Sequence, residues 1–199
     1  KTHFFSAACQ FSITVNGKNW KIDPGVVVKG RSGATLTVVN GTMTAVGTET
    51  EPIIFTSLPD DAYGGDTNNN GSTSLPAPGN WGGLQAGDGT DNGMIKAVNI
   101  IQRYGGSGIS VNKSILDISM STVSFNASYG IELVGHSTGT IFRSVITRNS
   151  SLGIYLSGAA NVNIDQSVIS SNAYGIYSNQ PLGSIRLSSN TISNNVNQA

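Results

Sequence analysis

Acidic and amide side chains gather in one stretch of the sequence, residues 56–80. The candidate metal ligands there are Asp60, Asp61, Asp66, Asn68 and Asn70, with glycines between them. Ca²⁺ takes six to eight oxygen ligands, which a flexible loop of this composition can supply. The sequence therefore predicts a structural calcium ion that orders this loop. A solvated polar turn without metal is the alternative, and the glutamate that closes an EF-hand loop is absent.

Four tyrosines form the candidate ligand-binding set. Tyr155 and Tyr177 occupy one position of a repeat of 22–23 residues, and Tyr129 and Tyr174 occupy another. Stacked tyrosines can hold sugar rings through apolar contact and hydroxyl hydrogen bonds. This spacing predicts a small aromatic ladder on the protein surface that binds carbohydrate. Aromatic side chains that only cover the outer surface are the alternative.

Catalytic residues are harder to find. Polysaccharide hydrolysis needs paired carboxylates, and elimination needs a basic residue beside carboxylates that bind calcium. No two outward carboxylates share a position of the repeat. Arg143 and Asp165 are 22 residues apart, which predicts a surface ion pair between adjacent repeats. The sequence thus favours no enzymatic activity, and an enzyme would have to use the loop aspartates with Lys96 or Arg103.

The repeat itself predicts the elements that position these side chains. Segments 122–126, 145–149, 168–172 and 191–195 align at three successive spacings of 23 residues. Their apolar residues alternate with a period of two, which is typical of strands with one buried face. Three short strands per repeat describe one turn of a coil, and turns must stack because one turn cannot bury its own apolar face. The sequence predicts an all-β parallel solenoid.

Two further columns of the repeat carry structural predictions. An asparagine recurs at a corner of each repeat, where stacked amides can bond one another, at Asn126, Asn149, Asn172 and Asn195. A glycine precedes an isoleucine in each repeat, and we expect backbone angles there that other residues avoid, at Gly108, Gly130, Gly153 and Gly175.

The domain organisation follows from where the period holds. We expect a single domain over residues 1–199, with regular repeats at 98–195 and an inserted loop at 56–80. Residues 1–15 are off the period and are expected to cap the first turn. The chain ends within a repeat, so we also expect further domains beyond either terminus or a partner over the last turn.

Charge and hydropathy exclude several classes of protein. The chain has 11 Lys and Arg against 11 Asp and Glu, and 38% of its residues are hydrophobic. A nucleic-acid-binding surface needs an excess of basic residues, and disorder needs few apolar ones. No apolar run approaches the ~20 residues of a membrane helix. We therefore expect neither a nucleic-acid partner nor membrane insertion.

Four segments carry a resemblance to a known family, namely residues 22–29, 36–45, 51–56 and 79–84, which read IDPGVVVK, LTVVNGTMTA, EPIIFT and GNWGGL. Together with the repeats of residues 98–195 they resemble the right-handed parallel β-helix repeat domains of bacterial secreted and cell-surface proteins. The resemblance implies a right-handed coil and a secreted or cell-surface location. That family includes polysaccharide lyases and hydrolases, carbohydrate-binding adhesins, and domains without known activity.

We therefore expect a non-catalytic extracellular module that presents a rigid surface for carbohydrate or cell-surface attachment, with a polysaccharide or surface glycan as partner. A polysaccharide lyase or hydrolase is the first alternative, and a structural stalk is the second. Ice binding is the third, because the outward residues of segments 122–124, 145–147, 168–170 and 191–193 resemble the ice-binding faces of antifreeze β-helices.

Overall fold

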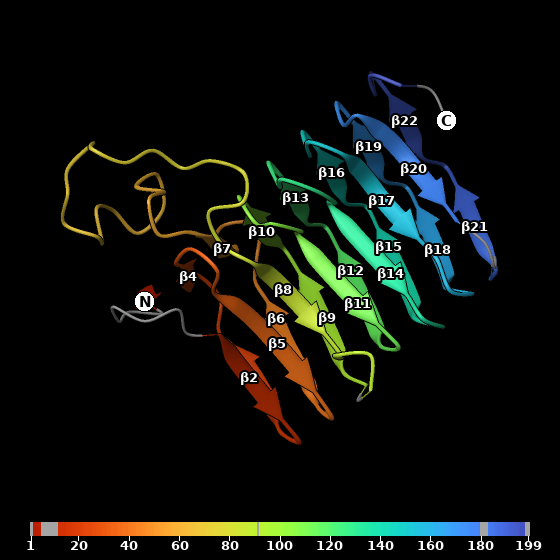
Figure 1. The fold of residues 1–199 in the computed structure, drawn as a ribbon, viewed down its shortest axis with the longest axis horizontal. Helices are drawn as coiled ribbons and strands as arrows, with labels where there is room; N and C mark the ends of the chain where they lie inside the picture. Colours follow the sequence, from red (N-terminus) through yellow and green to blue (C-terminus); the bar gives the residue numbers. More distant parts are fainter. Residues whose placement is uncertain (1, 5–11, 91, 180–182, 198–199) are drawn as a thin grey trace.

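The computed structural model describes residues 2–4, 12–90, 92–179 and 183–197, and over these ranges the chain forms 22 strands and no helix. Each strand pairs in parallel with the strand three places along the chain, so that three sheets run along a coil (Figure 1). The predicted all-β solenoid is confirmed, with one turn for each set of three strands. Within the described ranges there is no helix with the length and hydropathy to span a bilayer.

The sheets are named A, B and C. Sheet A contains β1 (Thr2–Phe4), β4 (Val27–Gly30), β7 (Ile53–Ser57), β10 (Ile100–Arg103), β13 (Thr122–Ser124), β16 (Val145–Thr147), β19 (Val168–Ser170) and β22 (Thr191–Ser193). Sheet B contains β2 (Ile13–Asn16), β5 (Thr35–Val39), β8 (Gly83–Ala86), β11 (Ile109–Asn112), β14 (Ile131–Val134), β17 (Leu152–Leu156) and β20 (Tyr174–Ser178). Sheet C contains β3 (Asn19–Ile22), β6 (Thr42–Val46), β9 (Met94–Val98), β12 (Ile115–Ser119), β15 (Thr138–Phe142), β18 (Asn161–Asp165) and β21 (Ile185–Ser188).

Inward-facing aliphatic side chains fill the coil. Val123, Ile146 and Ile169 stand opposite one another on sheet A and have no exposed surface. Ile131 and Ile154 form a matching column on sheet B. Burial of each such side chain contributes about 1.5–3 kcal/mol. The register confirms that equivalent residues of successive repeats lie directly above one another.

The predicted asparagine ladder is present at the corner between sheets A and B. The Nδ2 atom of Asn126 donates to Oδ1 of Asn149 at 2.9 Å, and Asn149 donates to Asn172 in the same way. All three side chains are buried. The turn before Asn126 has a glycine, Gly105, at the equivalent position, and there the inward side chain of Gln102 exchanges two hydrogen bonds with Asn126. Gln102 thus extends the ladder by one turn.

The glycines that precede the isoleucines have a different role from the predicted one, because none of the four has a left-handed backbone. A Cβ atom on Gly153 would lie 2.7 Å from Cγ2 of Ile169 and 2.8 Å from Nδ2 of Asn172. These glycines are therefore required by close packing between the isoleucine column and the asparagine ladder. The left-handed angles fall on the residue before each ladder asparagine, with φ of 56–58° at Phe125, Arg148, Ser171 and Asn194.

Two segments depart from the regular coil. Residues 58–82, between β7 and β8, contain no strand, and the loop extends away from the stack beside β4, β7 and β10 (Figure 1). At the other departure, Thr2–Phe4 pairs with β4 at the edge of sheet A, and Ile13–Asn16 is a regular strand of sheet B. Residues 1 and 5–11 of the predicted cap lie outside the described residues, so the cap stays a prediction.

Candidate functional site

The inserted loop is anchored to one outward column of sheet A. Lys29 of β4 stands opposite Thr56 of β7, and Arg103 of β10 extends the same column toward Ser124. Alternation along each strand turns these side chains away from the core. The loop aspartates approach this column from outside the coil. The result is a cluster of opposite charges between the loop and the sheet.

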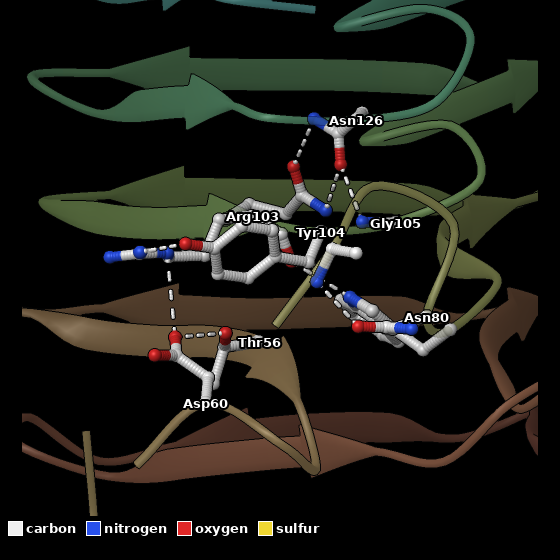
Figure 2. Close-up of polar contacts among 10 residues, drawn as sticks. Thr56, Asp60, Asn80, Arg103, Tyr104, Gly105 and Asn126 are labelled. Atoms are coloured by element: carbon white, nitrogen blue, oxygen red, sulfur yellow. Dashed lines mark hydrogen bonds and ion pairs between the residues drawn. The ribbon is translucent and has the colours of Figure 1, made fainter. Parts of the chain in front are cut away.

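Asp60 is the centre of this cluster. Its side chain is 1% exposed, and its Oδ2 atom accepts a hydrogen bond from Oγ1 of Thr56 at 2.5 Å. The same oxygen lies 3.4 Å from Nε of Arg103 (Figure 2). The carboxylate is therefore enclosed by one hydroxyl and one guanidinium. Because it has almost no exposed surface, it cannot reach a polymer in solution without movement of the loop.

Aromatic rings enclose the guanidinium of Arg103 on its other sides. Its Cζ atom lies 4.4 Å from the ring centre of Tyr104, 5.4 Å from that of Tyr63 and 5.7 Å from that of Phe125. Nη2 of Arg103 also donates to the Tyr104 hydroxyl (Figure 2). Burial alone would lower the pKa of Arg103, but this hydrogen bond and the charge of Asp60 raise the pKa above its ordinary value.

Lys29 is the second anchor of the loop. Its side chain has no exposed surface, and its Nζ atom donates to the carbonyl oxygen of Gly65 at 2.7 Å. Burial lowers the pKa of Lys29, while the charges of Asp61, Asp60 and Asp66 oppose that shift. A buried ammonium and three nearby carboxylates therefore hold the first half of the loop against β4.

The predicted calcium ligands do not all share one environment. Asp66 accepts hydrogen bonds from the backbone amides of Asn70 and Gly71, at 3.2 and 2.8 Å, and both Asn68 and Asn70 donate to Ser74. In the ranges that the structure covers, no three or more His, Cys, Asp or Glu residues are grouped to hold an ion.

One observation nevertheless leaves room for an ion in the loop. Oδ1 of Asp61 and Oδ1 of Asn68 are buried without a hydrogen-bond partner. Buried oxygens of this kind are ligands that a hard cation accepts. The calcium site with Asp60, Asp61, Asp66, Asn68 and Asn70 stays a prediction.

Three of the four predicted tyrosines form a ladder beside sheet B. The ring centres of Tyr129 and Tyr155 are 5.0 Å apart, those of Tyr155 and Tyr177 are 6.1 Å apart, and both pairs are stacked. Tyr174 stands opposite Leu152 and makes no ring contact with the ladder. The two faces of Tyr155 are covered by its neighbours, so the ladder offers a sugar mainly its ring edges, its hydroxyls and the outer face of Tyr177.

Sheet C carries a shallow groove that the sequence did not indicate. One section has a volume of about 440 Å³ and is lined by outward residues of β12, β15, β18 and β21, among them Asp117, Thr140, Asn163 and Arg186. A second section of about 530 Å³ continues it toward β6, sharing Met94, Ile115 and Thr138. The groove crosses the strands of sheet C from β6 to β21. Five strand spacings of ~4.8 Å make it about 24 Å long.

Other charged residues lie apart from both surfaces. The predicted ion pair between Arg143 and Asp165 is wrong: Nε of Arg143 donates to Oε1 of Gln166, and Gln166 donates to Asp165. The amide of Gln166 stands between the two charges and bonds both. Lys96 lies on the outer face of sheet C, whereas Arg103 contacts Asp60 on sheet A. Of the two basic residues considered for catalysis, only Arg103 therefore meets a loop aspartate.

Sequence reasoning missed Lys29 and Gln102. Lys29 follows Val26 and Val28, whose alternation already places it outward, but no sequence pattern shows that the loop returns to cover it. Gln102 stands at an inward position, opposite Phe55 and Val123. The sequence did contain a signal for Gln102: it is a polar residue at a position that is otherwise apolar, and the corner that follows it has glycine in place of the ladder asparagine.

Comparison with known protein families matches residues 67–199 to the family described as the right handed beta helix region. The match covers the second half of the loop and all the regular repeats. Comparison with curated proteins found no match to this chain.

Proposed function

Because this chain belongs to the right-handed β-helix family, we propose that it is a non-catalytic module, secreted or on a cell surface, that presents the sheet C groove to an extended carbohydrate. The groove is the observation that carries the proposal. It is open, it crosses six strands, and its length of about 24 Å suits several sugar units of a linear chain. A rigid coil holds this surface in shape before the ligand arrives.

The lining of the groove has the chemistry that sugar binding needs. Asp117, Asn163 and Arg186 offer planar polar groups that can bond adjacent hydroxyls, and Thr140 adds a hydroxyl of its own. Ile115 is 47% exposed at the edge and gives an apolar contact for a ring face. Binding sites for small molecules combine apolar contact with a few placed polar groups in this way.

The tyrosine ladder supplies a second contact for the same class of ligand. Tyr177 is 46% exposed and ends the stack, so one face of its ring is open. Tyr129 and Tyr155 hold that ring upright through stacking. We expect the ladder to contribute through Tyr177 above all.

The main charge cluster favours a module over an enzyme. Asp60 and Lys29 are buried and bonded within the protein, so neither can act as an acid or base on an external polymer while the loop is closed. A lyase or hydrolase stays the first alternative and a structural stalk the second. Ice binding is the third, on the outward sheet A file that contains Val145 and Val168, each 36% exposed.

The proposal is tested by measuring, with calorimetry, the affinity of the protein for each of a panel of soluble polysaccharides. Each lost hydrogen bond is worth about 0.5–1.5 kcal/mol, so Thr140→Ala and Asn163→Ala should each weaken affinity about 2- to 10-fold. Thr147→Ala on sheet A is the matched control and should change nothing.

The same panel separates the alternatives. Release of unsaturated or reducing ends, with or without calcium, would overturn the non-catalytic assignment. Absence of any binding would favour the stalk. Unchanged affinity in Tyr155→Ala and Tyr177→Ala would remove the ladder from the binding site.

A further inference from the structure

The charged residues on the outer face of sheet C follow a pattern across the strands. One outward column contains one residue from each strand, in the order Lys21, Thr44, Lys96, Asp117, Thr140, Asn163 and Arg186. We call these seven residues the sheet C column. Three of them are cationic and one is acidic, so the column carries a net positive charge on a chain whose net charge is zero.

The three cations fall on every second strand. Lys21 and Lys96 are two strands apart, and Lys96 and Arg186 are four strands apart. At ~4.8 Å per strand these separations are about 10 and 19 Å. The acid Asp117 stands on an intervening strand, as do the neutral residues Thr44 and Asn163. The pattern has one break, because Thr140 on β15 stands where a fourth cation would complete it. Three of the four alternate strands β3, β9, β15 and β21 therefore carry a cation.

The cations of the column are available to a ligand. Lys96 and Arg186 are exposed and form no ion pair with any residue that the structure describes. Lys21 lies 3.5 Å from Asp23, but both side chains are more than 60% exposed, so this ion pair is weak and easily exchanged. In contrast, Lys29 and Arg103 are committed to the loop on sheet A. Of the three cations of the column, Arg186 lines the groove, and Lys21 and Lys96 lie in register with it on the same outer face.

We propose, resting on the proposed function, that the ligand lies along the sheet C column beside the groove and is a linear polyanionic glycan whose negative charges recur on every second sugar. One sugar unit extends a linear glycan by a length close to the ~4.8 Å strand spacing, so a chain along the coil axis places about one unit over each strand. In an extended glycan, every second sugar presents the same side to the protein. Carboxylates or sulfates on alternate units then meet Lys21, Lys96 and Arg186, and the one between Lys96 and Arg186 meets the hydroxyl of Thr140.

The intervening strands fit the uncharged units. Asp117 can accept hydrogen bonds from the hydroxyls of a neutral sugar, and Asn163 can both donate and accept. A polymer charged on every unit would place an anion over Asp117, which would oppose its binding. The column therefore selects for alternation of charge and not only for total charge.

Three probes test the inference by calorimetry: hyaluronan, whose carboxylates alternate with neutral sugars, polygalacturonate, which is charged on every unit, and a neutral β-glucan. We expect hyaluronan to bind best, with affinity that falls as salt is raised. The double variant Lys96→Gln/Arg186→Gln should lose at least about tenfold in affinity for hyaluronan. Arg148→Gln, an exposed arginine outside the column, should stay within about twofold.

The remaining outcomes are distinct. If only the neutral glucan binds, the inference fails and the proposed function stands. If polygalacturonate binds as tightly as hyaluronan, the alternation is wrong. If no glycan binds, both proposals fail. Because both substituted positions are exposed, equal unfolding midpoints of native and variant proteins should show that any loss comes from the charges.

Discussion

Removing Arg103 should detach the inserted loop. In Arg103→Ala, Asp60 would keep the hydrogen bond from Thr56 but lose its only cationic neighbour within 4 Å among the described residues. Leaving one partner of a buried ion pair without the other costs about 3–5 kcal/mol. The loss of ring contacts with Tyr104, Tyr63 and Phe125 adds about 0.5–1 kcal/mol. Because the loop lies outside the coil, it can open so that the carboxylate reaches water, and we expect this local opening rather than unfolding of the coil.

Chymotrypsin provides a direct assay of that opening. The loop contains two aromatic residues that chymotrypsin recognises, Tyr63 and Trp81, while Leu58 and Leu75 are each followed by proline, which blocks cleavage. Trp81 is 1% exposed and donates to the carbonyl oxygen of Arg103 within the coil, so Tyr63–Gly64 is the expected site. An opening equilibrium that is about 3 kcal/mol more favourable corresponds to a cleavage rate about 100-fold higher. Arg148→Ala is the control, because Arg148 also lies over Phe125, at 5.5 Å, but is exposed and forms no ion pair with a carboxylate in the described ranges.

A double variant identifies the cause. If the buried, unpaired charge of Asp60 drives the opening, Arg103→Ala/Asp60→Ala should be cleaved more slowly than Arg103→Ala alone. Cleavage of Arg103→Ala within threefold of the native rate would refute the reasoning. So would a double variant that opens more than the single one, because the cost would then lie in lost packing.

Three further predictions concern charge, the amide ladder and metal. Burial lowers the pKa of Lys29, so the folded protein binds this proton less tightly than the unfolded chain does. The free energy of unfolding should therefore rise as the pH increases toward 10.5. Between pH 7 and pH 10 the urea midpoint should rise less in Lys29→Met than in the native protein. Asn149→Ala removes the acceptor of two Asn126 groups and should cost about 1–3 kcal/mol for each, whereas Asn195→Ala at the ladder's end should cost less in urea unfolding. If calcium orders the loop, a chelator should lower the melting temperature; an unchanged value counts against the site.

The fold was predictable because equivalent residues recur in the sequence at a nearly constant spacing. Alternation of apolar residues fixes strands, and a spacing of 23 places Val123 over Ile146 and Ile169 without any further information. The asparagine ladder followed from the same spacing. The glycine columns were misinterpreted, since the sequence shows that glycine recurs but not that Gly153 lacks room for a Cβ atom. Steric fit is a property of neighbours that are distant in the sequence.

The candidate sites were less predictable than the fold. The loop stood out by its composition, but its contacts with Lys29 and Arg103 depend on a fold-back that has no period to reveal it. The sheet C column was hidden for another reason. Its members come from the irregular N-terminal half as well as from the regular repeats, so the register of Lys21 and Lys96 with Arg186 could not be counted from the sequence.

The sequence by itself determined the repeating local structure of this protein: its strands, its corners and the column of buried amides. These depend on residue type and spacing, which act between near neighbours and between equivalent positions of successive turns. Only the tertiary structure decided which outward residues meet. The closed loop over Lys29 and the row of charges in the sheet C column arise because a coil brings residues about 22 or more positions apart to within one strand spacing.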